Sequence, residues 1–158
     1  MRGFSLIEIL IYITIFAVVS VIIVDQFSII YLAYNQSIIQ KTVSQNIRHP
    51  LKRMTLAIRE ANDVVSASPS YLELSFSDPN QNPTIFRLNN GVVEIKEGIG
   101  DYRALTSANV LVENLDFEEI TNPPDYKSVK IYLKISFNNQ GNQQWQEIQE
   151  INTTVALR

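Results

Sequence analysis

The sequence predicts an α+β fold, in which a long N-terminal helix packs on an antiparallel β-sheet head. Three observations predict it. Residues 4–24 are almost entirely apolar, residues 39–65 repeat apolar side chains at helical spacing, and residues 66–158 alternate between apolar and polar side chains. A chain of 158 residues suits one such domain.

The composition excludes several classes of protein. The apolar share of 46% and the charged share of 18% exclude a disordered chain. The net charge of −3 disfavours a phosphate-binding surface, so we expect no direct nucleic-acid partner. With no cysteine and a single histidine, His49, the chain lacks the residues for disulfides, Cys-ligated zinc and His-rich metal sites.

Residues 4–24 contain only two ionisable side chains, Glu8 and Tyr12. As a helix they are about 31 Å long, which matches a hydrocarbon core of about 30 Å. A secretory signal peptide has a shorter apolar core and a small-residue cleavage site, and no such site precedes or follows Asp25. We therefore expect a single transmembrane helix. Because Arg2 precedes it and Asp25 follows it, we expect a cytoplasmic N-terminus and an external head.

Glu8 is unusual because an ionisable group inside an apolar span costs on the order of 2.5 kcal/mol or more. Its position alone leaves two interpretations open. Glu8 either stays hydrated or protonated near the interface, or it has a function.

The residues around Glu8 favour a function. The run Arg2-Gly3-Phe4-Ser5-Leu6-Ile7-Glu8, followed by an apolar span, resembles the processing signal of type IV prepilins and pseudopilins. The resemblance implies that a prepilin peptidase cuts after Gly3, removes residues 1–3 as a leader, and methylates the new N-terminus at Phe4. Because Gly3 has no Cβ, an extended backbone can enter a protease cleft at this position.

The same resemblance implies the partners and the location of the chain. Glu8 becomes an assembly contact, paired with the Phe4 ammonium group of a neighbouring subunit. The N-terminal helix contacts membrane lipid before assembly, then the inner-membrane assembly platform and other pilins. The protein moves from the cell membrane into a filament. One departure from many major pilins is the lack of a proline near the end of the span, since the first proline is Pro50.

Residues 25–65 predict an amphipathic helix that covers the sheet. Its apolar stripe has steps of three and four residues and consists of Ile39, Val43, Ile47, Leu51, Met54, Ile58, Ala61 and Val65. Pro50 predicts a kink near residues 46–50, or a short break between two helices, because it removes a backbone hydrogen bond.

The segment 41–59 is basic, and the rest of the chain is acidic. Five bases and no acid occur in this segment, namely Lys41, Arg48, Lys52, Arg53 and Arg59, whereas fourteen acids and seven bases follow it. Two interpretations are open. The segment docks on an acidic neighbour or on lipid headgroups, or it is a solvated helix face that balances the acidic head, which is the interpretation we favour.

Residues 66–158 predict an antiparallel sheet built from hairpins. Asn90-Gly91 is a strong hairpin signal between strands at 84–88 and 92–96. A strand at 110–117 has a slip in its alternation that predicts a bulge, and the alternation at 129–137 is the clearest of all. The segments 121–125 and 138–144 predict turns, and residues 145–157 predict one or two final strands.

The head is also similar, more loosely, to the PilW-like or J-type branch of minor pilins and pseudopilins. The segments that carry this similarity, in chain order, are Leu56–Ala61, Phe86–Gly91, Leu105–Ser107, Val112–Phe117 and Thr153–Arg158.

The sequence suggests no catalytic site, no cofactor and no metal site. His49 is more typical of a helix surface than of a catalytic base. Asp116, Glu118, Glu119 and Asp125 lack the order of ligands of a calcium loop, and strand alternation sends Glu118 and Glu119 to opposite faces. We therefore interpret this acidic edge as solvated.

These observations predict a minor pilin or pseudopilin, a structural subunit of a type IV pilus-like or type II secretion-like filament. The alternatives are a major pilin, a single-pass anchored binding domain that forms no filament, and a secreted β-domain with an atypical signal peptide.

The leader can be tested with one substitution. Because the peptidase requires a compact residue before the cut, Gly3→Val should leave the precursor uncut and in the membrane. The intact mass of the membrane-extracted variant, measured beside the wild type, checks this. Normal maturation of Gly3→Val would contradict the prepilin interpretation.

Overall fold

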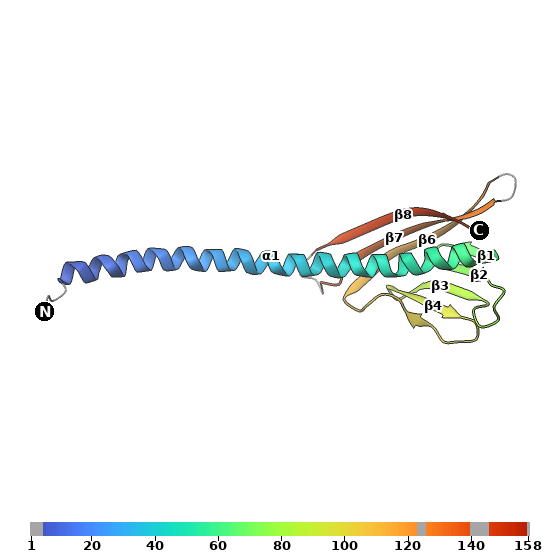
Figure 1. Ribbon diagram of the computed structural model, residues 1–158, viewed down its shortest axis with the longest axis horizontal. Helices are drawn as coiled ribbons and strands as arrows, with labels where there is room; N and C mark the ends of the chain where they lie inside the picture. Colours follow the sequence, from blue (N-terminus) through green and yellow to red (C-terminus); the bar gives the residue numbers. More distant parts are fainter. Residues whose placement is uncertain (1–4, 123–125, 140–145, 158) are drawn as a thin grey trace. The chain divides into compact units, whose positions relative to one another are not determined.

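The computed structural model describes residues 5–122, 126–139 and 146–157, and it divides the chain into two compact units, residues 1–38 and residues 39–158. Helix α1 (Leu6–Glu60) contributes to both units (Figure 1). The strands of the described residues all belong to the second unit. They are β1 (Asp63–Ser68), β2 (Tyr71–Ser75), β3 (Thr84–Asn89), β4 (Val92–Glu97), β5 (Arg103–Ala104), β6 (Val110–Asn122), β7 (Tyr126–Phe137) and β8 (Ile148–Ala156).

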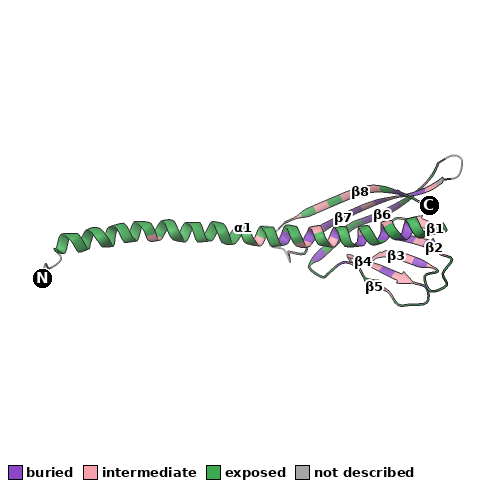
Figure 2. Cartoon of the chain, in the orientation of Figure 1, coloured by how far each residue is buried: buried purple, intermediate pink, exposed green. Residues whose placement is uncertain are grey.

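The first unit is a bare apolar helix. Its side chains are exposed almost without interruption as far as Ile38 (Figure 2), and Leu6 and Phe16 are 82% and 75% exposed. In the described part of the chain, α1 is the helix that is long and apolar enough to cross a membrane, judged by length and composition. Within the described residues of this unit, nothing covers the predicted span.

The second part of α1 buries one face in the head. Its buried residues are Ile39, Val43, Ile47, Pro50, Met54, Ala57 and Ile58. Five of these belong to the predicted stripe, whereas Pro50 and Ala57 were not predicted and the stripe residue Leu51 is only partly buried. Pro50 lies inside the helix, so the alternative of a break between two helices is wrong, whereas a bend at this residue stays a prediction. The ring of Pro50 is buried, and this burial offsets part of the cost of the lost hydrogen bond.

The described residues of the head form two antiparallel sheets, where the sequence predicted one. The first sheet has the order β1-β2-β3-β4-β5 and the second has the order β6-β7-β8. The helix was also predicted to extend to residue 65, but it ends at Glu60 and β1 begins at Asp63. The backbone N–H of Asn62 donates to the carbonyl of Ser75, which starts the pairing with β2. Val65, the last residue of the predicted stripe, lies in β1 and is 59% exposed, whereas its neighbour Val64 is buried, so the spacing of apolar residues did not locate the boundary.

Helix α1 and both sheets share one hydrophobic core. Backbone hydrogen bonds also join the sheets, from Ser70 N–H to the Leu115 carbonyl and from Val112 N–H to the Gly91 carbonyl, both with N···O distances of 2.9 Å. Two features therefore require glycine at position 91, namely the backbone conformation of the turn and the close approach of the second sheet. Its φ is +77°, and a Cβ there would lie 2.3 Å from Cδ1 of Leu111.

Several predicted details of the head are confirmed. Strands β3 and β4 pair in the predicted hairpin, and Asn90 and Gly91 both have positive φ, as a type I′ turn requires. The predicted bulge lies between Val112 and Asn114, and β7 covers the predicted strand 129–137. The predicted turn at 121–125 begins too early, because Thr121 and Asn122 belong to β6 and pair with β7. Its other residues, 123–125, and most of the predicted turn at 138–144 lie outside the described residues.

The buried stripe predicts a graded effect of helix substitutions on a fragment of residues 39–158. Met54→Ala should lower the free energy of unfolding by about 2–5 kcal/mol, because Met54 is fully buried and its removal leaves a cavity. Leu56→Ala is the matched control, since Leu56 is 39% exposed and should cost less than about 1.5 kcal/mol. Urea unfolding followed by circular dichroism measures both values. Equal losses would contradict the described packing of the helix.

Candidate functional site

Glu8 lies in the first turn of α1. Its backbone N–H donates to the carbonyl of Ser5 at 3.0 Å, and Ile9 N–H donates to the same carbonyl at 3.3 Å. The side chain of Glu8 is exposed, and among the described residues its carboxylate has no ion pair. The carboxylate is therefore available to a group from outside the chain. Gly3 and Phe4, the predicted processing residues, lie outside the described residues.

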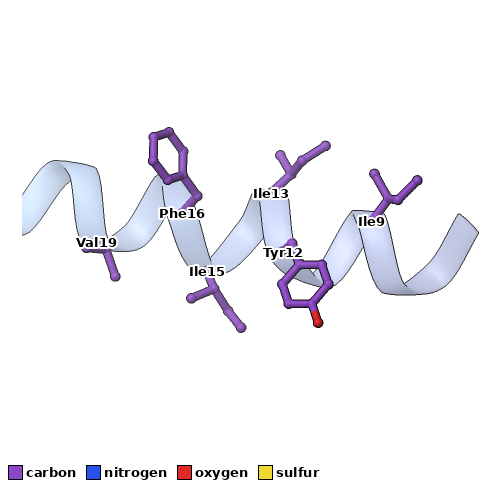
Figure 3. A pocket seen from close by; sticks show the side chains of 6 residues that line it. All are labelled: Ile9, Tyr12, Ile13, Ile15, Phe16 and Val19. Carbon is purple, nitrogen blue, oxygen red and sulfur yellow. The ribbon is translucent and has the colours of Figure 1, made fainter. Parts of the chain in front are cut away.

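The helix surface beyond Glu8 is apolar and shallowly hollowed. Six side chains line this depression, namely Ile9, Tyr12, Ile13, Ile15, Phe16 and Val19. Figure 3 shows them in two rows on one helix, with the Tyr12 hydroxyl as the one polar side-chain atom. Because no second element encloses the depression, it is an uncovered helix surface and not a ligand cavity. Such a surface suits lipid chains or the side chains of another helix.

Comparison with known proteins bears on this end of the chain. The family model of the prokaryotic N-terminal methylation motif matches residues 1–24. This match supports the type IV prepilin and pseudopilin superfamily. No curated protein and no solved structure was found to match the chain.

The match covers the segment that contains Gly3, Phe4 and Glu8. It supports a type IV pilin-like protein that a prepilin peptidase processes and that assembles with other pilins. It also favours a structural subunit over an enzyme. Together with the exposed apolar helix, it supports membrane anchoring followed by filament assembly.

The acidic edge of the head is largely paired with lysines. Glu118 and Glu119 form ion pairs with Lys130 and Lys127 at N···O distances of 3.3 and 3.4 Å. A depression of about 190 Å³ is lined by Asp116, Glu118, Lys130, Tyr132 and Asn152, so an ammonium group already accompanies its carboxylates. Within the described residues no group of three or more potential ligands could hold a metal ion. Asp125 lies outside the described residues.

His49 lies at the helix surface, as the sequence predicted, and has a structural contact. Its ring Nδ1 donates to the carbonyl of Leu105 at 3.2 Å. Nearby, the side-chain oxygen of Asn46 accepts from the backbone N–H of Ser107 at 2.8 Å. Both contacts fix the loop after β5 to α1. They join residues far apart in the sequence, so no local pattern could have predicted them.

Two ion pairs in the head shift the pKa values of their carboxylates. Lys134 Nζ lies 2.7 Å from Glu113 and Lys127 Nζ lies 2.5 Å from Asp63. Hydrogen bonds from these ammonium groups lower the pKa of Glu113 and the pKa of Asp63. Tyr71 differs, because its hydroxyl donates to Glu73 at 2.7 Å and this raises its pKa to about 12.

The lowered carboxylate pKa values predict an acid-sensitive head. Both carboxylates bind protons more weakly in the folded chain, so their contribution to stability is present above about pH 4 and is lost as the pH falls through the folded-state pKa. The urea concentration at the unfolding midpoint of residues 39–158 should be measured from pH 7 down to pH 2. It should decrease once the pH falls below about 4. Glu113→Gln should show a smaller fall than wild type, and an identical pH profile would contradict the role of this pair.

Proposed function

We propose that this chain is a structural subunit of a type IV pilus-like or type II secretion-like filament. A prepilin peptidase would cut it after Gly3 and methylate Phe4, and the mature helix would then leave the lipid for the filament core. The observation that carries the proposal is the coincidence of the methylation motif with an apolar helix whose side chains are exposed in the described part of the chain. The proposal includes no catalytic role.

Glu8 would act as the assembly contact in this filament. A carboxylate buried among packed helices is costly unless an opposite charge lies beside it. The free ammonium group of a mature Phe4 on a neighbouring subunit would supply that charge. The exposed carboxylate of Glu8, unpaired among the described residues, supports this role.

The topology and the order of partners follow from the charges and from the motif. The N-terminus would be cytoplasmic and the head external, because Arg2 precedes the span and Asp25 follows it. The helix would first contact membrane lipid and the peptidase, then the inner-membrane assembly platform, and finally the helices of other pilins.

Within this class we propose a minor pilin or pseudopilin of the PilW-like or J-type branch. The similarity of the head segments supports this branch, and a major pilin is the second candidate. The two candidates differ in abundance, so the number of copies relative to the main filament subunit decides between them. A protein that is absent from filaments but remains anchored in the membrane would instead favour an anchored binding domain.

The role of Glu8 predicts a specific assembly defect. Glu8→Ala should insert into the membrane and mature normally, because the cleavage site is unchanged. Its incorporation should fall strongly, since an unpaired Phe4 ammonium in the helix core would cost about 3–5 kcal/mol. Glu8→Gln should behave in the same way, because the amide keeps the size but not the charge. The measurement is the ratio of sheared-filament protein to membrane-bound mature protein.

The filament-to-membrane ratio and a cross-linking result together test whether Glu8 pairs with a neighbouring Phe4. An unchanged ratio in both variants would contradict the pairing of Glu8 with a neighbouring Phe4 in this subunit, unless the subunit occupies the filament tip. Cross-linking of the Phe4 end to the next subunit decides that case. Thr14→Ala is the control, because Thr14 lies on the same exposed helix and its hydroxyl only donates to the Ile11 carbonyl of its own helix.

A further inference from the structure

Apart from Lys96, the basic residues of the described chain fall into two groups. The first group forms ion pairs with acids of the head and consists of Arg53, Arg87, Arg103, Lys127, Lys130 and Lys134. Lys96 and Arg87 also lie over the ring of Tyr102. The second group has no such contact among the described residues and consists of Lys41, Arg48, Lys52 and Arg59. We name this second group the basic stripe.

The basic stripe lies on one line of α1. Its members are spaced by seven, four and seven residues, which places them within about 40° of one another around the helix axis at 3.6 residues per turn. All four side chains are exposed. The buried residues Val43, Ile47 and Met54 lie on the opposite side of the helix. The core therefore fixes the orientation of the stripe and presents it outward.

Arg53 belongs to the basic segment 41–59 but not to the basic stripe, because it lies on a different face of the helix. It lies about 100° or more from the stripe around the axis, and it pairs there with Glu97, which also binds Arg103. Arg53 therefore balances an acid of its own head. The stripe is a solvated face within the described chain, and its four charges are available to a partner. Like charges four residues apart, such as Arg48 and Lys52, destabilise a helix unless an external anion offsets them.

We propose that the basic stripe is a docking surface for carboxylates on the head of the adjacent subunit in the filament. This proposal rests on the filament function proposed above. Heads of this kind offer the complementary charge, since fourteen acids and seven bases follow residue 59 in this chain. On the outer side of β6–β8, Glu118 is already paired with Lys130 and Glu150 accepts from the Tyr132 hydroxyl. Asp116 on the same side has no ion pair among the described residues, so it is the carboxylate there that an adjacent stripe could bind.

Lipid headgroups fit the stripe less well than protein carboxylates do. A helix that binds a membrane surface inserts its apolar face into the lipid and places its bases at the headgroups. The apolar face of α1 between Val43 and Ile58 is already buried in the head core. A contact through the basic stripe alone therefore favours the charged surface of a second folded head.

Carbodiimide cross-linking of sheared native filaments tests the contact directly, because it joins a lysine amine to a carboxylate only where the two touch. We expect Lys41 or Lys52 to be linked to an Asp or Glu of a different, identified filament subunit. The pairs Lys134–Glu113 and Lys127–Asp63 within the chain are internal controls for the reaction. Links at these controls without any link at Lys41 or Lys52 would overturn the proposal.

A charge-neutral variant tests whether the contact matters for assembly. Lys41→Gln/Arg48→Gln/Lys52→Gln should reduce incorporation into filaments about fivefold, since each exposed charge pair contributes modestly and the three act together. The charge-conserving variant Lys41→Arg/Arg48→Lys/Lys52→Arg is the matched control and should incorporate as the wild type does. Equal incorporation of both variants would overturn the proposal.

The outcomes also separate this proposal from the filament function on which it rests. If the wild type is recovered in filaments but the stripe lysines link to no carboxylate, only the docking proposal fails. If the neutral variant loses membrane association and the wild type shows no protein link, the stripe binds lipid phosphate and the docking proposal is wrong. If the wild type is absent from filaments, both proposals fail.

Discussion

The constraint on which the proposed function depends is the apolar surface between Leu6 and Ile38, which is exposed among the described residues. Each square ångström of such surface costs roughly 25 cal/mol in water, so this helix requires lipid or other helices around it. The methylation motif at residues 1–24 supports a transfer of this helix from lipid to the packed helices of a filament. Membrane anchoring and filament assembly are then two ways of meeting one physical requirement.

The same helix meets a different requirement from Ile39 onward. Here one face is buried against two sheets, and the opposite face carries the basic stripe. The head consequently has its own core and its own ion pairs, including Lys134–Glu113 and Lys127–Asp63. Head and apolar helix therefore depend on different interactions, and substitutions can separate the stability of the head from assembly.

Local patterns in the sequence predicted the elements, and contacts between distant residues decided the rest. The alternation at 129–137 and the Asn90-Gly91 turn predicted β7 and the β3–β4 hairpin. The predicted helical stripe ended at Val65, but this residue lies in β1, so the end of α1 became visible only through the pairing of β1 with β2. The division into two sheets and the pairing of Arg53 with Glu97 depend on contacts across many residues, which no spacing rule encodes.

The most direct test of the central claim is the N-terminus of the mature protein extracted from membranes of the native host. Intact mass and terminal sequencing identify it without any substitution. The account predicts a chain that begins at Phe4 and carries one N-methyl group. A chain that begins at Met1 would indicate a simple membrane anchor, and one that begins after the apolar segment would indicate secretion. Either result would contradict processing as a prepilin.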